Sequence, residues 1–403
     1  MHGSTKEISH IAPPQGGQNA GNGSALIRRF AALLEPADDH GLERMARQAR
    51  RLTDQHFGRT VRMFAPLYLS NECINDCAYC GFSRSNPILR VTLPVEAVVR
   101  EARHLVDRGF RNVLLVAGEH PKFVSDGYLE ACIRALRDWV PSIGIEVGPM
   151  ETPEYRRMVQ AGCEYLVVYQ ETYDREVYGE MHTAGPKKHF DWRLECPQRG
   201  YEGGFRRIGI GALFGLADWR SEAMGLARHL EHLQRVAWTS SFTVSFPRLR
   251  PAAGGFQPRT RFTDRDLVQL MSAIRLCFPQ VGIVLSTREP ASLRDALAGI
   301  AVTHMSAGSH TEPGGYTGAG QEDVHLTVRG KRVDLDQRGG SERADGQFDI
   351  ADHRSPEVVA ERLRDLGLDP VWKDWDAAIL PGGNGGRTPS KLAGGQLAGV
   401  GAV

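Results

Sequence analysis

Short apolar runs alternate with longer amphipathic segments through the middle of the chain. Eight runs rich in Val, Ile, Leu and aromatic residues have the length of buried strands, and they lie at residues 61–70, 113–119, 143–149, 165–171, 207–216, 241–249, 281–287 and 302–308. Strands that alternate with helices form βαβ units around a parallel sheet. Eight such units predict an α/β fold with a closed (β/α)8 barrel of the TIM type, for which about 250 residues is typical. A doubly wound open sheet is the alternative arrangement.

Helix signals lie between these runs. Apolar residues of the segment 95–106 recur at the spacing of one helix face, and Gly109 follows where a terminating glycine is expected. A second helix is predicted to start with Thr152 as its N-cap and to end at Gly162. Thr263 is predicted to cap a third helix.

The pattern divides the chain into one barrel and its extensions. The predicted parts are disordered tails at 1–24 and 381–403, an N-terminal helical extension at 25–60, the barrel at 61–312, a surface insertion at 313–347 and a C-terminal extension packed on the barrel at 348–380. Within the insertion, the runs VHLTV and KRVDL are strand-like and favour a hairpin.

Composition excludes several classes of protein. The 49 Lys and Arg residues nearly balance the 48 Asp and Glu residues, so no basic surface for nucleic acid is expected. No run of 18 apolar residues occurs and the N-terminal residues do not resemble a secretory signal, which predicts a cytoplasmic protein without membrane segments. The chain has seven cysteines, an odd number that favours reduced thiols over a disulfide framework.

Three of the cysteines lie close together, directly after the first predicted strand. Cys73, Cys77 and Cys80 form a C-x-x-x-C-x-x-C pattern, and soft thiolates at this spacing suit iron–sulfur or zinc ligation. A structural zinc site requires four protein ligands, whereas a 4Fe–4S cluster bound by three cysteines leaves one iron open. A zinc knuckle completed by a nearby His or Cys is the alternative. The remaining cysteines are expected to be structural, and they are Cys132, Cys163, Cys196 and Cys277.

Polar side chains follow five of the predicted strands, at the barrel end where (β/α)8 enzymes place their active sites. Among them, Glu119 is a suitable acceptor for an ammonium group, and Ser286 with Arg288 could bind a planar carboxylate through a bidentate fork. Arg248 and Arg250 follow the sixth run and have two interpretations, as ligand-binding residues or as a structural ion pair under the rim.

The sequence CINDCAYCGF resembles the signature of the radical S-adenosylmethionine (SAM) superfamily. Residues 63–376 further resemble the 2-iminoacetate synthases, the ThiH tyrosine lyases that serve the thiazole of thiamine. The segments that carry this resemblance are LYLSNECINDCAYCGF, LLVAGEH, VVYQETY, DWRLE, TVSFPRLRP, LSTREP, PGGY and PVWKDWD. The resemblance implies cleavage of the Cα–Cβ bond of L-tyrosine to 2-iminoacetate and p-cresol, with SAM converted to methionine and 5′-deoxyadenosine.

The resemblance also implies roles for individual residues. Cys73, Cys77 and Cys80 would bind a 4Fe–4S cluster. The residues expected near SAM are Tyr79 at the adenine, Gly118 and Glu119 at the amino group, Glu171 at the ribose or amino-acid part, Arg193 at the carboxylate, and Gly209 and Gly211 at the adenosyl part. Arg288, with Ser286, would bind the carboxylate of the substrate. Four of these residues have simpler interpretations: Tyr79 as a packing aromatic, Glu119 as a solvated carboxylate, and Glu171 and Arg193 as surface charges.

The implied partners are an external electron donor of the flavodoxin or ferredoxin type and the thiazole synthase ThiG. Alternative functions are a tryptophan lyase, a maturase like HydG and a non-catalytic iron–sulfur protein. HydG carries a second cluster on cysteines of a C-terminal extension, and since the last cysteine here is Cys277, the HydG chemistry is not expected.

Overall fold

The computed structural model describes residues 24–328, 331–333 and 343–372. The predicted tail at 381–403, and all of the tail at 1–24 except Ser24, lie outside the described residues. None of the described helices is both long enough and apolar enough to cross a membrane.

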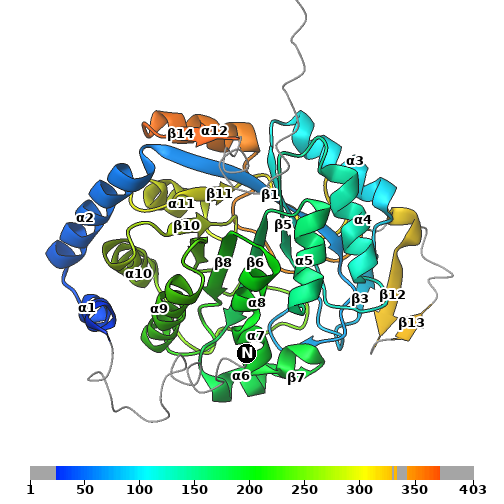
Figure 1. The fold of residues 1–403 in the computed structure, drawn as a ribbon, viewed down its shortest axis with the longest axis horizontal. Helices are drawn as coiled ribbons and strands as arrows, with labels where there is room; N and C mark the ends of the chain where they lie inside the picture. The colour runs from blue at the N-terminus through cyan, green and yellow to red at the C-terminus, as the bar shows by residue number, and fades with distance from the viewer. Residues whose placement is uncertain (1–23, 329–330, 334–342, 373–403) are drawn as a thin grey trace, which may run out of the picture.

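Eight parallel strands form a closed barrel (Figure 1). In barrel order they are β1 (Thr60–Ser70), β4 (Asn112–Ala117), β5 (Ser142–Glu146), β6 (Tyr165–Glu171), β8 (Arg207–Ala212), β9 (Ser241–Ser245), β10 (Gly282–Leu285) and β11 (His304–Ser306). The last strand pairs with the first, since Arg62–Phe64 of β1 lie opposite His304–Ser306 of β11. This closure confirms the predicted (β/α)8 fold and excludes the open sheet. Each of the eight predicted runs contains one strand.

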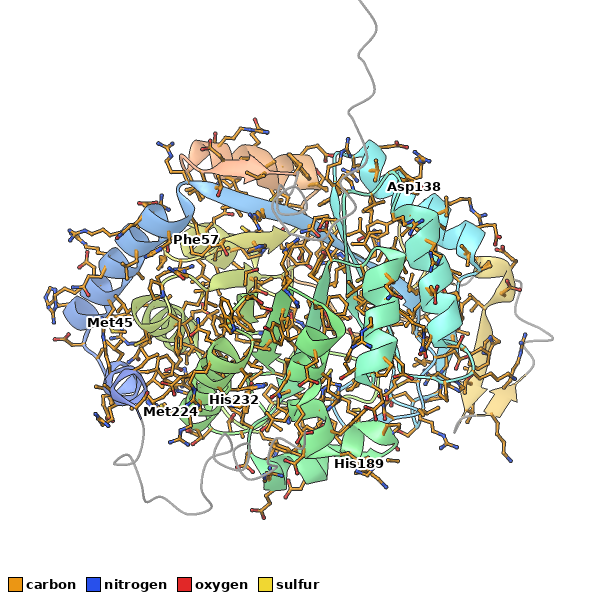
Figure 2. All side chains as sticks on the ribbon, viewed as in Figure 1. Met45, Phe57, Asp138, His189, Met224 and His232 are labelled. Atoms are coloured by element: carbon orange, nitrogen blue, oxygen red, sulfur yellow. The ribbon has the colours of Figure 1, made fainter. Side chains whose placement is uncertain are left out.

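Helices surround the strands (Figure 1). They are α3 (Val95–Asp107), α4 (Asp126–Leu136), α5 (Thr152–Ala161), α6 (Arg175–Met181), α7 (Phe190–Leu194), α8 (Cys196–Gly203), α9 (Trp219–Val236), α10 (Asp264–Cys277) and α11 (Ala291–Ala298). Side chains fill the space between this outer layer and the sheet (Figure 2).

Most of the predicted helix ends are confirmed. Gly109 follows α3 with φ +97°, and Gly162 ends α5 with φ +123°, a backbone conformation that favours glycine. The Thr263 side chain accepts a hydrogen bond from the backbone of Asp266 and caps α10. The prediction for α5 was wrong by one residue. Its N-cap is Glu151, because the Glu151 and Glu154 carboxylates bond reciprocally to the backbone and leave Thr152 as the first helical residue.

Several of the predicted strands are shorter than expected. The runs 207–216 and 241–249 end as strands at Ala212 and Ser245. Beyond these residues, the chain continues as two loops that touch through an isolated bridge between Phe214 and Arg248.

Both extensions pack on the barrel. At the N-terminal side, α1 (Ala25–Leu34) and α2 (Asp39–Phe57) contact α10. At the C-terminal side, α12 (Pro356–Asp365) contacts α11, and β14 (Asp369–Val371) pairs in parallel with the first residues of β1.

The strand-like runs in the segment 313–347 pair with each other. β12 (His325–Val328) and β13 (Lys331–Val333) form an antiparallel pair, and β12 also pairs with β3 (Ile88–Arg90), which follows the cysteine loop. The hairpin therefore extends a sheet beside that loop, at the right of Figure 1.

A fully buried ion pair joins the C-terminal extension to the barrel. Arg294 of α11 donates to a carboxylate oxygen of Asp352, and neither side chain is exposed. Arg354 also binds Asp352. Removing one partner of a buried pair is costly, because the remaining charge stays desolvated.

We predict that Asp352→Asn lowers the free energy of unfolding by about 3–5 kcal/mol, since it leaves Arg294 buried without its counter-charge. Chemical denaturation followed by circular dichroism measures this loss. The exposed residue Asp369 provides the control, and Asp369→Asn should change stability by less than about 0.5 kcal/mol. Equal stability of the two variants would contradict the prediction.

Candidate active site

The cysteine loop follows β1 and is held by buried polar groups. The guanidinium of Arg90, which is 1% exposed, donates to the carbonyl oxygens of Asn71, Phe82 and Ser83. These bonds fold the loop around one cation. β2 (Asp76–Cys77) pairs with β7 (His182–Ala184) and fixes the other side of the loop.

The three thiols lie close enough to influence one another. Burial raises the pKa of Cys73 and Cys77, and the neighbouring cysteines of the loop raise it further. Three thiolates therefore require a cationic partner in order to remain deprotonated together. The donor set fits an iron–sulfur cluster.

The zinc alternative concerns the same three cysteines. Among the described residues, no three or more Cys, His, Asp or Glu side chains are arranged to hold a single metal ion. A zinc knuckle requires four ligands around one ion, whereas each thiolate of a 4Fe–4S site binds a different iron and the sulfurs stay further apart.

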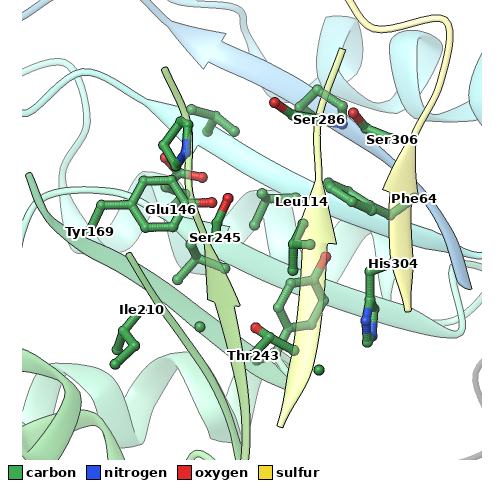
Figure 3. A pocket seen from close by; sticks show the side chains of 18 of the residues that line it. Phe64, Leu114, Glu146, Tyr169, Ile210, Thr243, Ser245, Ser286, His304 and Ser306 are labelled. Carbon is green, nitrogen blue, oxygen red and sulfur yellow. The ribbon is translucent and has the colours of Figure 1, made fainter. Parts of the chain in front are cut away.

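A cavity of about 620 Å³ lies inside the barrel and reaches the cysteine loop. Residues at the carboxyl ends of the strands and in the loops beyond them line its upper part, and they include Tyr68, Tyr79, Cys80, Glu146, Tyr169, Glu171, Lys187, Ser245, Ser286, Arg288, Gln347 and Phe348. Figure 3 shows Glu146, Tyr169 and Ser245 gathered on one wall. The cavity places the cysteine loop and the predicted substrate residues around one space.

Glu171 is the centre of a buried ion cluster. Its carboxylate bonds to Lys187 at 2.7 Å and to Arg193 at 3.4 Å. Burial raises the pKa of Glu171, but the charges of Lys187 and Arg193 outweigh burial and lower it overall. Glu171 is also the one non-glycine residue with positive φ, +72°, in the described part of the chain. Backbone strain of this kind is concentrated at functional sites.

Tyr79 lines the cavity but its hydroxyl is already bonded. His182 Nδ1 donates to the Tyr178 carbonyl, so its other nitrogen, Nε2, accepts from Tyr79 at 2.9 Å. Burial lowers the pKa of His182 to about 3 and keeps the ring neutral. This packing supports the simpler interpretation of the Tyr79 side chain, while its ring still faces the cavity.

Gly118 and Glu119 lie against the cysteine loop and are not among the residues that line the cavity. A Cβ at Gly118 would lie 2.3 Å from the carbonyl oxygen of Glu72, so only glycine permits this approach. The Glu119 carboxylate accepts a hydrogen bond from Asn75 Nδ2 at 2.7 Å. Glu119 is thus bound to the loop rather than solvated at the rim.

The two glycines of β8 have different surroundings. Gly209 lines the cavity. Gly211 does not, and a Cβ there would lie 2.7 Å from the carbonyl oxygen of Ser245 and 2.8 Å from the ring of Tyr169. Gly211 therefore makes room for the Tyr169 side chain.

Arg288 lies just after β10, is partly buried and lines the cavity. Its guanidinium stacks on Phe348 at 3.3 Å, and it forms no ion pair with any residue that the structure describes. Ser286 lines the same wall. Arg248 instead bonds Glu289 and Asp264, which supports its interpretation as a structural ion pair.

Sequence reasoning missed several residues of the cavity, and four of them bear on the chemistry of the site. Glu146 ends β5 within a predicted strand, and its position at the carboxyl end of that strand was a usable signal. Lys187 lies in a short 3-10 turn, Pro186–Lys188, that carries no motif. Gln347 is the last residue of the segment predicted as a surface insertion and Phe348 is the first residue after it, yet both line the cavity.

Comparison with known proteins assigns the chain. The Radical SAM superfamily model matches residues 67–224, and the Biotin and Thiamin Synthesis associated domain matches residues 245–369. The 2-iminoacetate synthase of Escherichia coli (strain K12) is 43% identical over 90% of this chain and 91% of its own length. The chain belongs to the 2-iminoacetate synthase family. The 2-iminoacetate synthase of Salmonella typhimurium is 42% identical over 86% of each chain.

Solved structures support the same fold for this member of the 2-iminoacetate synthase family. The maturase HydG from Carboxydothermus hydrogenoformans superposes with a TM-score of 0.77 at 34% identity, covering 92% of this chain and 79% of HydG. Membership in the family makes the chain a radical SAM enzyme, a class that uses a 4Fe–4S cluster and SAM. The alternative of a non-catalytic iron–sulfur protein is thereby set aside.

We predict that Cys73→Ala abolishes the visible absorbance of the anaerobically reconstituted cluster, because two thiolates cannot hold three irons. Cys277→Ala is the matched control, since Cys277 is buried in α10 away from the loop. Iron and sulfide analysis should show a full cluster in the control. Retention of the cluster in Cys73→Ala would exclude Cys73 as a ligand.

A second prediction concerns stability and pH. Burial raises the pKa of Glu146 to about 7, and Glu171 adds to the rise. The folded protein therefore binds this proton more tightly than the unfolded chain, and stability falls as pH rises from about 4.5 to 7. Glu146→Gln should be more stable than the parent above pH 7, by roughly 1–3 kcal/mol, and the advantage should shrink toward pH 5. Denaturation curves at these two pH values measure the difference, and a pH-independent difference would contradict it.

Proposed function

We propose that this enzyme cleaves the Cα–Cβ bond of L-tyrosine to 2-iminoacetate and p-cresol for the thiazole moiety of thiamine. The relationship to the 2-iminoacetate synthases supports the reaction. One structural observation supports it further. Arg288 is a partly buried cation that forms no ion pair in the described chain, and it lines the same cavity as Cys80.

We assign the cluster to Cys73, Cys77 and Cys80. When bound, the cluster and SAM together supply an oxidant that removes a single hydrogen atom from the substrate. The SAM-binding residues of the proposal are Tyr79, Gly118, Glu119, Glu171, Arg193, Gly209 and Gly211. The surroundings of Glu171 and Gly209 support their assignment, since these residues line the cavity, and Arg193 bonds to Glu171 there. In the proposal, Gly118 and Glu119 hold the conformation of the cysteine loop, and Gly211 leaves room beside β8 for Tyr169.

In the proposal, Arg288 binds the substrate carboxylate and Ser286 contributes a further hydrogen bond. A guanidinium matches a planar carboxylate with two parallel hydrogen bonds. A buried cation without a counter-charge is unfavourable on its own, and a bound carboxylate removes this penalty. Such a clamp holds the reacting part of the substrate in one orientation.

The reaction requires two electrons in total. One electron cleaves SAM to methionine and the group that takes the hydrogen atom. After hydrogen removal, the Cα–Cβ bond of tyrosine breaks to give 2-iminoacetate and a 4-hydroxybenzyl fragment. That fragment takes one electron and one proton to become p-cresol. An external one-electron donor of the flavodoxin or ferredoxin type would supply both electrons.

The imine product reacts readily with water, which favours its direct transfer to a thiazole synthase of the ThiG type. The residues around the cavity would keep water from the reacting groups. Gln347 and Phe348 cover the cavity next to Cys80 and Arg288. Exclusion of water also strengthens the charge interactions inside the site.

The reconstituted protein, supplied with SAM and a strong reductant, should form p-cresol and 5′-deoxyadenosine from tyrosine. Arg288→Ala should lower p-cresol formation at least about 100-fold, because a buried bidentate clamp contributes several kcal/mol, and cluster absorbance should not change. Arg364→Ala, at an exposed position of α12, is the control. Consumption of tryptophan without p-cresol from tyrosine would favour the tryptophan lyase alternative, and unchanged turnover in Arg288→Ala would exclude the clamp.

A further inference from the structure

Glu146 is a carboxylate of the cavity to which neither the sequence motifs nor the relatives' names assign a role. It is the last residue of β5 and lines the cavity beside Tyr169 and Ser245 (Figure 3). Two residues from other parts of the barrel, Tyr68 of β1 and Arg288 after β10, lie near enough to interact with it electrostatically.

The carboxylate of Glu146 forms no hydrogen bond and no ion pair with any residue in the described ranges. The contrast with Glu171 is clear, since Lys187 and Arg193 both bond to that carboxylate. Arg193 is further held by the backbone oxygen of Tyr169 at 2.6 Å. Lys187 and Arg193 thus bond to Glu171 and not to Glu146, so in the described part of the chain the Glu146 carboxylate remains a free acceptor that faces the cavity.

Arg288 is a cation that, like the Glu146 carboxylate, has no ion-pair partner in the described chain. It faces the same cavity, and the only contacts recorded for its guanidinium in the described chain are the ring of Phe348 and a weak bond at 3.4 Å to the Arg248 carbonyl. Among the described residues, the cavity is thus lined by one carboxylate without a partner, Glu146, and by arginines without an ion pair, which include Arg288 and Arg250. Of these two cations, Arg288 is the one that interacts electrostatically with Glu146. Buried charges of this kind are stabilised only by a partner, and an α-amino acid carries both complementary charges on one carbon.

We propose that Glu146 binds the ammonium group of the amino-acid substrate while Arg288 binds its carboxylate. The inference rests on the proposed function and adds the second half of the recognition. Two attachment points at neighbouring atoms of the substrate fix Cα and its amino group in space. A carboxylate–ammonium pair in a water-poor cavity is a charge-assisted hydrogen bond of the strong class.

The rest of the lining suits the remaining part of the substrate. Phe64, Leu114 and Val167 line the cavity deeper in the barrel, and Figure 3 shows Phe64 and Leu114 directed into it. With the amino and carboxylate groups held by Glu146 and Arg288, the aromatic side chain has an apolar region available to it. Recognition is then divided between two charges and an apolar wall.

The test is a binding comparison that does not depend on turnover. Equilibrium dialysis measures the affinity of the anaerobically reconstituted protein, with SAM and without reductant, for tyrosine and for 3-(4-hydroxyphenyl)propionate, which lacks only the amino group. Glu146→Gln should weaken tyrosine at least tenfold and leave the desamino acid unchanged or bound more tightly. Glu361→Gln, an exposed carboxylate of α12, should change neither affinity.

Equal weakening of both ligands would overturn the proposal, because it would indicate a structural role. Weaker binding of tyrosine with unchanged binding of phenylalanine would also overturn it, since Glu146 would then contact the phenol. Partial recovery of tyrosine affinity in Glu146→Asp would support it. Formation of p-cresol by the parent protein is scored separately, so that failure of the proposed function is distinguished from failure of the Glu146 assignment.

Discussion

The ion pairs of Glu171 with Lys187 and Arg193 determine what the other charges of the cavity can do. Two cations share one buried carboxylate, and the cluster keeps an excess positive charge. That excess is suited to an additional anion, such as the carboxylate of SAM. Lys187 and Arg193 bond to Glu171 and not to Glu146, and the proposal therefore leaves Glu146 and Arg288 to the two charged groups of the substrate.

This division of charge depends on the closed barrel. Pairing of β11 with β1 completes a ring in which β5, β6 and β10 end at the same rim. Glu146 ends β5, Glu171 ends β6 and Arg288 follows β10, and all three line one cavity. An open sheet would separate them along an edge. Closure also limits the water inside, which makes each unpaired charge more costly and each correct partner more favourable.

Much of this arrangement was predictable from the sequence. The eight apolar runs predicted the barrel because buried parallel strands are nearly continuous in apolar residues. The cysteine spacing and the rim position led to Cys73, Cys77, Cys80 and Arg288, which keep their predicted roles in the proposed function. Glu146 was missed because one acidic residue in an apolar run does not change the pattern. Lys187 was missed because its position depends on pairing between β2 and β7, a contact between segments about 100 residues apart that no local signal encodes.

The end of the segment predicted as a surface insertion lies against the cysteine loop. The segment's polar composition predicted that insertion, yet the backbone of Gly81 donates to the Gln347 carbonyl, and the Tyr68 hydroxyl donates to the Gln347 side chain at 2.8 Å. Polar residues also form hydrogen bonds to the backbone and hydroxyl groups of a buried loop. Composition alone therefore does not distinguish an exposed insertion from a segment that lies over the active site. Since Phe348 stacks on Arg288, this short segment contacts both the cysteine loop and the arginine proposed to bind the substrate carboxylate.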